Sequence, residues 1–336
     1  MKPILGITMG DAAGIGPELI LKAFRSPELF ERCRPLVVGS RAVMDLYQRL
    51  LDIQVPMRSV TSAEEALYGP GTLDILDLGL VDAAALAIGK VAAEPGNASV
   101  VYTQAAGRLA LEGAIDAIVS APLNKETFHM AGYTAMDDMT YFQECFATGE
   151  AYQVGEVAGL WTTPVTFHVP FRRIPDLITK EAVLSKIRIL HQVMTAAKVT
   201  PVKIGVAALN VHGGEGGMFG REEIDIIGPA IQQAKAEGIN VVGPIPADSF
   251  FPLALRGDFK GMVFMYHDQA NIGRKILGRD SPGVSLFLGM PVPVVTVPHG
   301  TAYDIAWKGV AKHAMIVHAI TMAVSLAQGS APATGK

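Results

Sequence analysis

The sequence predicts an α/β fold in which helices cover a mostly parallel β-sheet. Short apolar runs rich in β-branched residues alternate with longer amphipathic stretches over most of the 336 residues. Half of the residues are apolar, which is enough to bury a sizeable core. Alternation of this kind is typical of parallel strands joined by helical crossovers. Since the chain exceeds one typical domain, one large or two medium domains are expected.

The elements follow in order along the chain. Seven runs are expected to form buried strands, at residues 4–8, 35–39, 117–122, 164–168, 203–209, 261–267 and 293–299. Three intervening stretches show the apolar period of helices that pack on a sheet, at residues 16–30, 182–199 and 227–238. No internal repeat or low-complexity linker interrupts this pattern, so the sequence marks domain boundaries only weakly.

Composition excludes several classes of function. The net charge of -4 gives no basic footprint for nucleic acid or an anionic membrane. Two cysteines, Cys33 and Cys145, cannot form a disulfide framework, which suits a reducing compartment. The longest uncharged stretch, at residues 281–300, contains four prolines and is a poor transmembrane helix. We therefore expect a soluble, cytoplasmic protein without a signal peptide.

The glycine-rich stretch "GDAAGIGPE" at residues 10–18 separates the first strand from the first helix. A dinucleotide fingerprint needs glycines at G-x-G-x-x-G, and a Walker A loop needs Gly-Lys-Ser/Thr before its helix. Neither spacing is present, and Asp11 and Glu18 would repel a phosphate. We therefore expect a tight strand-to-helix turn, with Pro17 in the first helical turn, where its missing N–H costs nothing.

Three of the eight histidines end predicted strands where a loop begins, namely His168, His212 and His267. In an open α/β sheet, the loops at the carboxyl ends of the strands converge on the ligand site. Three imidazoles there are a candidate facial set for a divalent metal, whereas any one of them alone could equally be a hydrogen-bonded rim histidine.

Polar residues accompany these histidines. Glu215, in the glycine-rich loop after His212, could orient an imidazole. Asp268 and Lys275 follow His267, and the lysine could hold a substrate carboxylate or transfer a proton. Asp248, in "GPIPADSFF", is a further candidate carboxylate. Late in the chain, "PHGTAYDIAWKGVA" predicts a tight turn at His299 and Gly300, with Asp304 capping a helix that follows.

As an ordered set, these motifs carry a family resemblance. The stretches "GDAAGIGPE", "SAPLNKE", "LNVHGGEGGMFGREE", "GPIPADSFF", "YHDQ" with Lys275, and "HGTAYDIA" span residues 10–310. They resemble the 4-hydroxythreonine-4-phosphate dehydrogenase family of pyridoxine biosynthesis and its catabolic relatives, in the isocitrate/isopropylmalate-dehydrogenase-like superfamily. The resemblance implies two α/β/α domains with an active-site cleft between them. Residues 1–128 and 285–336 would form the cofactor side, and residues 129–284 the metal and dimer-interface side.

The resemblance also assigns site residues. It implies a metal held by His168, His212 and His267, in a homodimer that shares the site, with His267 from the partner chain. It implies NAD or NADP, with the adenosine half near His299, Gly300, Thr301, Ala302 and Asp304. Lys275 would act in substrate binding or proton transfer, supported by Asp248 and Asp268. The opening loop would line the cleft, with Asp11 and Glu18 as cleft-side polar groups.

The sequence departs from the family at the substrate site. Relatives that act on phosphorylated substrates carry a His-Thr pair where this chain has Asp138 and Met139, and an asparagine and an arginine where it has Ser285 and Val294. Two carboxylates gained, on Asp137 and Asp138, and one guanidinium lost make a poorer anion site. Arg274 or Arg279 could compensate. We therefore expect retained redox chemistry with altered substrate recognition.

The main interpretation is a metal- and NAD(P)-dependent dehydrogenase of a hydroxy acid, resembling the 4-hydroxythreonine-4-phosphate and 4-phosphothreonate enzymes, with decarboxylation where a carboxylate lies β to the new ketone. Imidazole ligands favour Zn²⁺, while Mg²⁺, Mn²⁺, Co²⁺ and Ni²⁺ stay open. One alternative is a dehydrogenase of a non-phosphorylated carboxylated cis-dihydrodiol, similar to the terephthalate enzymes. Another is an inactive metal- or small-ligand-binding protein on the same scaffold.

Overall fold

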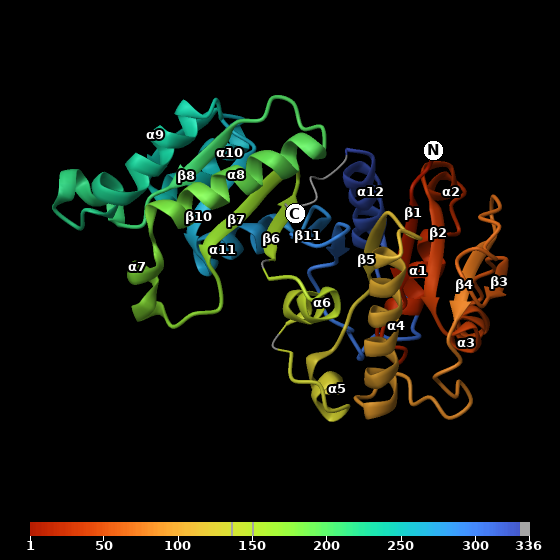
Figure 1. Cartoon of the computed structure of the whole chain (residues 1–336). Helices are drawn as coiled ribbons and strands as arrows, with labels where there is room; N and C mark the ends of the chain where they lie inside the picture. The colour runs from red at the N-terminus through yellow and green to blue at the C-terminus, as the bar shows by residue number, and fades with distance from the viewer. Residues whose placement is uncertain (136, 150, 330–336) are drawn as a thin grey trace. The chain divides into compact units, whose positions relative to one another are not determined.

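The structure is a computed structural model that describes residues 1–135, 137–149 and 151–329 (Figure 1). The chain divides into two compact units. Unit 1 comprises Met1–Gln153 with Val284–Lys336, and unit 2 comprises Val154–Gly283. The division therefore falls at 153/154, beyond the boundary at 128/129 that the resemblance implied. The roles assigned to the two domains stay predictions.

Unit 1 is built on a sheet in the order β3-β4-β2-β1-β5-β12-β11. All neighbouring strands in it are parallel, except that β11 and β12 run antiparallel. The strands are β1 (Ile4–Thr8), β2 (Arg34–Gly39), β3 (Met57–Val60), β4 (Leu73–Asp77), β5 (Ala117–Ser120), β11 (Gly283–Leu288) and β12 (Val294–Thr296).

The helices of unit 1 begin at recognisable signals. Pro17 lies in the first turn of α1, and the side chains of Ser40, Asn124 and Asp137 accept N-cap hydrogen bonds in α3, α5 and α6. The helices are α1 (Gly16–Ala23), α2 (Glu28–Arg32), α3 (Arg41–Leu51), α4 (Ala93–Leu111), α5 (Lys125–Met130), α6 (Asp138–Phe146) and α12 (Ala314–Gln328). Helix α4 packs on β1 and β2, and α12 packs on β5 and β12.

Unit 2 has the strand order β6-β7-β10-β8-β9, with an antiparallel β6–β7 pair and parallel pairing elsewhere. Helix α8 lies on one face of this sheet, and α10 and α11 lie on the other, as right-handed crossovers require (Figure 1). The strands are β6 (Tyr152–Val157), β7 (Leu160–Thr166), β8 (Ile204–Ala207), β9 (Val241–Ile245) and β10 (Gly261–Tyr266). The helices are α7 (Ile174–Leu177), α8 (Lys180–Ala196), α9 (Gly228–Ala236), α10 (Ala247–Arg256) and α11 (His267–Leu277), with short turns η1 (Phe171–Arg173), η2 (Val211–Gly217) and η3 (Glu223–Ile227).

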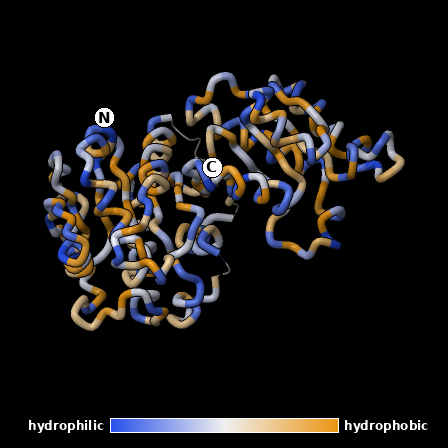
Figure 2. The backbone as a smooth tube through the Cα atoms, turned by 180° about the vertical axis from the view of Figure 1, so that it is seen from behind, coloured by the Kyte–Doolittle hydropathy of each residue, from blue (hydrophilic) through white to orange (hydrophobic). Residues whose placement is uncertain are grey.

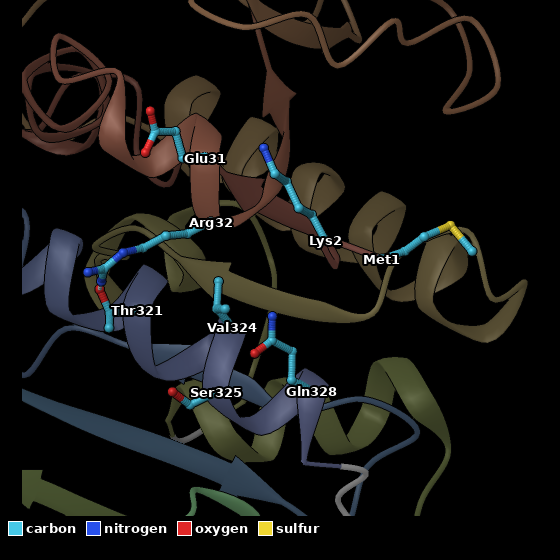
Figure 3. A pocket seen from close by; sticks show the side chains of 8 residues that line it. All are labelled: Met1, Lys2, Glu31, Arg32, Thr321, Val324, Ser325 and Gln328. Carbon is cyan, nitrogen blue, oxygen red and sulfur yellow. Dashed lines mark hydrogen bonds between the residues drawn. The ribbon is translucent and has the colours of Figure 1, made fainter.

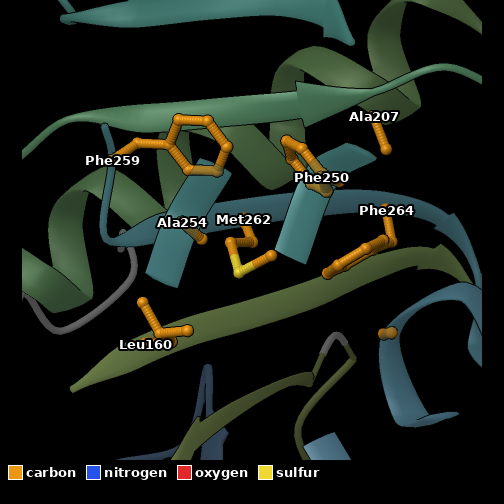
Figure 4. Packing of buried hydrophobic residues seen from close by; sticks show 8 residues of the cluster. Leu160, Ala207, Phe250, Ala254, Phe259, Met262 and Phe264 are labelled. Carbon is orange, nitrogen blue, oxygen red and sulfur yellow. The ribbon is translucent and has the colours of Figure 1, made fainter. Parts of the chain in front are cut away.

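One core cluster of unit 2 lies between its sheet and helices α10 and α11. Phe250 packs against Phe259 and Phe264, with ring centroids 5.0 and 4.9 Å apart, and Met262 and Leu160 complete the cluster (Figure 4). A side chain at Gly205 would come within 2.7 Å of the Phe250 ring, so β8 needs glycine there. This packing fixes the ends of β8 and β10, from which the candidate site is built.

The predicted α/β fold is confirmed. Each of the seven predicted strands is present; the predicted helix at 16–30 is divided into α1 and α2, that at 182–199 overlaps α8, and that at 227–238 contains α9. In Figure 2 hydrophobic and hydrophilic stretches alternate along the chain in both units. Among the described residues, no helix combines the length and the apolar character needed to cross a membrane.

Candidate active site

The three predicted histidines follow neighbouring parallel strands of unit 2. His168 comes two residues after β7, His267 directly after β10, and His212 lies in η2 after β8. These strands are adjacent in the order β7-β10-β8, so their carboxyl ends lie at one edge of the sheet. The ring centroids of His168 and His267 are 5.6 Å apart. Two imidazoles at this separation are close enough to bind one ion.

Neighbouring carboxylates hold two of these imidazoles. Nδ1 of His212 lies 3.2 Å from Oε2 of Glu215, the contact that the sequence suggested, and Nδ1 of His267 lies 2.7 Å from Oδ1 of Asp268. A carboxylate at Nδ1 favours the tautomer whose Nε2 carries a free lone pair. Both histidines are therefore prepared to bind a ligand through Nε2.

The loop that carries His212 has an unusual backbone, held by a buried carboxylate. Residues 212–217 all have positive φ, including His212 at 51° and Glu215 at 45°. Glu223 anchors the start of this loop, because its Oε1 accepts hydrogen bonds from the backbone N–H of Leu209 and Asn210, both at 2.8 Å. Sequence reasoning missed this anchor, since Glu223 is only one of several acidic residues after a glycine-rich run.

The described residues do not show the three histidines as one metal-binding group. Over residues 1–135, 137–149 and 151–329, no group of three or more His, Cys, Asp or Glu side chains is placed to hold a metal ion. The three-histidine site therefore stays a prediction.

A groove of ≈ 430 Å³ opens beside His267. Asp248, at the start of α10, and Asp268, in the first turn of α11, both line it. The rest of its lining is mainly apolar, with Phe251, Ile272 and Ile276 prominent. Lys275 is exposed in the last turn of α11 and is not among the lining residues. The structure thus places Asp248 and Asp268 on one groove, whose lining does not include Lys275.

Arg274 does not replace the missing arginine of the substrate site. Its guanidinium packs against Gly155 of β6, where an added Cβ would lie 2.1 Å from Cζ, and Nη1 donates to Asn271 Oδ1. Burial lowers its pKa, partly offset by Glu156. Arg274 therefore serves the interior of unit 2.

In unit 1, Asp11 joins three segments that are far apart in sequence. Its Oδ2 accepts hydrogen bonds from the hydroxyls of Tyr303, at 2.7 Å, and Thr127, at 3.1 Å, while Oδ1 accepts from the backbone N–H of Ala13. Asp11 and Glu18 are both 0% exposed, so the expectation that they are cleft-side polar groups is wrong. Glu18 is bound instead by Lys22 and the N–H of Ala311.

Burial of Asp11 predicts a pH effect on stability. Burial raises the pKa of this carboxyl, against the lowering effect of its three hydrogen bonds. When the pKa of an acid is higher in the folded than in the unfolded protein, its contribution to stability is fully present at pH values below the unfolded-state pKa. That contribution is lost as the pH rises through the folded-state pKa. Asp11→Asn should remove this pH-dependent loss of stability. The loss amounts to about 1.4 kcal/mol for each pKa unit by which folding raises the pKa of Asp11. Urea denaturation of both proteins from acid to neutral pH tests this; parallel profiles would contradict it.

Apart from Lys275, which lies in unit 2, the predicted substrate residues belong to unit 1, and their environments differ. Asp138 begins α6; burial raises its pKa, while Lys125 lowers it. Met139 follows it in the same turn. Ser285 Oγ accepts from Gln153 Nε2 at 3.4 Å, and Val294 is 0% exposed within β12. The sequence did not indicate that the positive charge of Lys125 acts on the Asp138 carboxyl, because the two residues belong to different helices.

The predicted cofactor residues form an open loop after β12. His299 Nδ1 lies 3.1 Å from the carbonyl oxygen of Gly300, and a Cβ added at Gly300 would meet nothing within 4 Å. Thr301 is buried, and its carbonyl oxygen accepts from the N–H of Ile15 in the opening loop. Ala302 has a φ of 43°, and Asp304 is exposed. No helix follows Asp304, because residues 303–309 form turns, so its predicted N-cap role is wrong.

A backbone that a ligand can approach, with exposed polar groups beside it, fits a dinucleotide. A further groove of ≈ 430 Å³ lies between the N-terminus, α2 and α12 (Figure 3). It contains none of the predicted residues.

The chain is similar to known proteins over nearly its whole length. The family model described as "Pyridoxal phosphate biosynthetic protein PdxA" matches residues 31–323. "Putative D-threonate 4-phosphate dehydrogenase" of Oceanobacillus iheyensis is 40% identical over 328 residues, which are 97% of this chain and 98% of that protein.

Two solved structures extend the comparison. A 4-hydroxythreonine-4-phosphate dehydrogenase from Klebsiella pneumoniae is 33% identical, with a TM-score of 0.85 over 98% of this chain and 99% of that one. A terephthalate 1,2-cis-dihydrodiol dehydrogenase from Burkholderia xenovorans LB400 is 28% identical, with a TM-score of 0.68 over 96% and 98%.

The fold and these matches define an oxidoreductase of the α/β class that acts on CH–OH groups. More narrowly, the chain belongs to the PdxA family.

Proposed function

We propose that this protein oxidises a secondary alcohol of a hydroxy acid, using NAD or NADP and a divalent metal, as the names of its D-threonate 4-phosphate and 4-hydroxythreonine-4-phosphate relatives suggest. The observation that carries the proposal is the set of strand-end imidazoles, two of which are held at Nδ1 by carboxylates. We also infer a reducing cytoplasmic setting, because Cys33 and Cys145 are free thiols.

His168, His212 and His267 would hold the metal, with Zn²⁺ favoured by imidazole ligands. When bound, such an ion supplies Lewis-acid stabilisation of a substrate alkoxide. The chain's own groups have separate roles. Asp268 and Glu215 keep the imidazoles oriented, and Lys275, which is exposed on α11, would bind a substrate carboxylate or transfer a proton.

We infer that a homodimer completes the site. Ile272 and Ile276 on α11, the helix that begins at His267, and Leu255 on α10 are 60–63% exposed. Clustered apolar side chains of this size mark protein interfaces. The resemblance takes His267 from the partner; the 5.6 Å separation of His168 and His267 within one chain is compatible with the other arrangement, in which His212 comes from the partner.

One observation favours a non-phosphorylated substrate as the second candidate. Asp138 places a carboxylate, and Val294 a hydrocarbon side chain, at positions that the resemblance assigns to phosphate binding. A carboxylate at this position repels a phosphate. Among the described residues, Lys125 is the one cation whose charge acts on the Asp138 carboxyl. A carboxylated cis-dihydrodiol, of the kind named for the Burkholderia xenovorans relative, would avoid this repulsion.

A substrate panel tests these alternatives. NADH formation is measured with D-threonate 4-phosphate, 4-hydroxythreonine 4-phosphate and a carboxylated cis-dihydrodiol, each with NAD and with NADP. Turnover of a phosphorylated acid supports the main proposal, and turnover of the diol alone supports the second. The exposed carboxylate of Asp304 predicts a preference for NAD, because it repels a 2′-phosphate. Metal or nucleotide binding without turnover of any substrate would indicate a binding protein.

A further inference from the structure

Trp307 combines an exposed aromatic ring with an unfavourable backbone. It lies in the turns at residues 303–309, its φ is 64°, and its side chain is 44% exposed. Large side chains rarely adopt this left-handed conformation, which glycine adopts freely. Such outliers gather at functional sites, where surrounding contacts hold them in place. Neither core packing nor backbone preference therefore explains a tryptophan at this position.

The ring lies where three segments of unit 1 meet. Cζ3 of Trp307 is 3.5 Å from the position that a Cβ on Gly89 would take, and the same Cβ would lie 2.8 Å from the carbonyl oxygen of Tyr303. The N–H of Gly89 in turn donates to the carbonyl oxygen of Ala13, in the opening loop, at 2.8 Å. One edge of the indole is thus fixed against backbone, while much of the remaining ring is open to solvent.

The surroundings of this ring suit a nucleotide. Trp307 follows the open loop at residues 299–304 and comes three residues after the exposed carboxylate of Asp304, a group that accepts hydrogen bonds from ribose hydroxyls. Lys308 and Lys90 are exposed and directly follow Trp307 and Gly89 in sequence, where their charge would favour a pyrophosphate. A rigid, half-exposed indole offers a stacking surface to a flat heteroaromatic ring.

We propose that Trp307 binds the adenine ring of the nicotinamide dinucleotide by stacking. This inference rests on the proposed NAD(P) dependence and adds a specific binding residue to it. The strained backbone is then the cost of presenting the indole beside the open loop. Nicotinamide, at the opposite end of the cofactor, would not contact Trp307.

Tryptophan fluorescence tests the proposal directly, because the other tryptophan, Trp161, is 3% exposed in unit 2. AMP is titrated against the full-length protein, with nicotinamide mononucleotide as the matched control. AMP should quench the fluorescence, nicotinamide mononucleotide should not, and the AMP signal should be absent from Trp307→Phe. The same quenching in Trp307→Phe, or no quenching of the native protein, would overturn the assignment.

Affinities of the variants give a second readout. Trp307→Ala and Trp307→Gly should weaken AMP and NAD binding, measured by calorimetry, by about 5- to 150-fold, which is the range for loss of one base–aromatic stack. Trp307→Phe should stay within about threefold, because it keeps a stacking ring. Equal AMP affinity in Trp307→Ala and the native protein would refute stacking even if the enzyme reduces NAD. Conversely, a failure to reduce NAD with intact stacking would refute only the proposed reaction.

Discussion

Replacing His212 with alanine should lower kcat/KM for NAD reduction by at least about a thousandfold, because metal stabilisation of an alkoxide is worth several kcal/mol. The variant should also lose bound metal, measured by elemental analysis of the purified protein. Folding should be little affected, since the His212 side chain is 64% exposed and its loop is anchored through Glu223.

His191→Ala provides a matched control, because His191 lies on α8, away from the three strand ends. It should keep both metal and activity. If His212→Ala retains native metal content and native turnover, the metal-site assignment is wrong. Glu223→Gln should have a metal content and an activity between those of His212→Ala and His191→Ala, because glutamine keeps the shape of the side chain that anchors the loop and loses its charge.

Introducing aspartate at Ile272 and Ile276 should convert a dimer into monomers and abolish most activity. Each charge would have to be buried in the interface, at a cost of several kcal/mol. Sedimentation and NADH formation report the two effects. Leu111→Asp is the control, because Leu111 is 56% exposed on α4 of unit 1 and should tolerate the change. A double variant that stays dimeric and active would contradict the proposed interface.

Mixed dimers test whether the site is shared between chains. Inactive His212→Ala and His267→Ala proteins are unfolded and refolded together at equal concentration. By random pairing, about half of the dimers then contain one chain of each variant, and each of these mixed dimers has one intact site out of two. About a quarter of the native activity should therefore return. No recovery would place the whole site in one chain. Mixing His168→Ala with His267→Ala restores activity only if His267 comes from the partner, which distinguishes the two shared arrangements.

The sequence predicted most of the strands that are continuous apolar runs; it missed the apolar β11 and the strands with mixed polarity. Continuous apolar runs such as residues 4–8 and 261–266 were recognised, whereas β3, with Arg58 and Ser59, and β4, with two aspartates, lack that signal. Strand β9 contains Gly243 and Pro244, which normally argue against a strand. Local composition could not reveal that neighbouring strands hold these segments in the sheet.

In the candidate site, too, contacts between residues close in sequence could be predicted, and contacts between residues far apart in sequence could not. Histidines at strand ends could be predicted, because a parallel sheet places such residues at one edge. The Glu215 contact could be predicted too, since it is three residues from His212. The Asp11–Thr127–Tyr303 contacts could not, because they join residues 116 and 292 positions apart. Asp11 was therefore assigned to the surface of a cleft, although its partners enclose it completely.

The most direct test of the central claim is NAD reduction by metal-depleted and metal-restored protein. The protein is treated with a chelator, dialysed, and assayed with the panel of hydroxy acids and the diol before and after adding Zn²⁺ or Mn²⁺. We predict that depletion abolishes NADH formation and that one of these ions restores it. Full activity of the depleted protein, or no NADH with any substrate after restoration, would contradict a metal-dependent hydroxy-acid dehydrogenase.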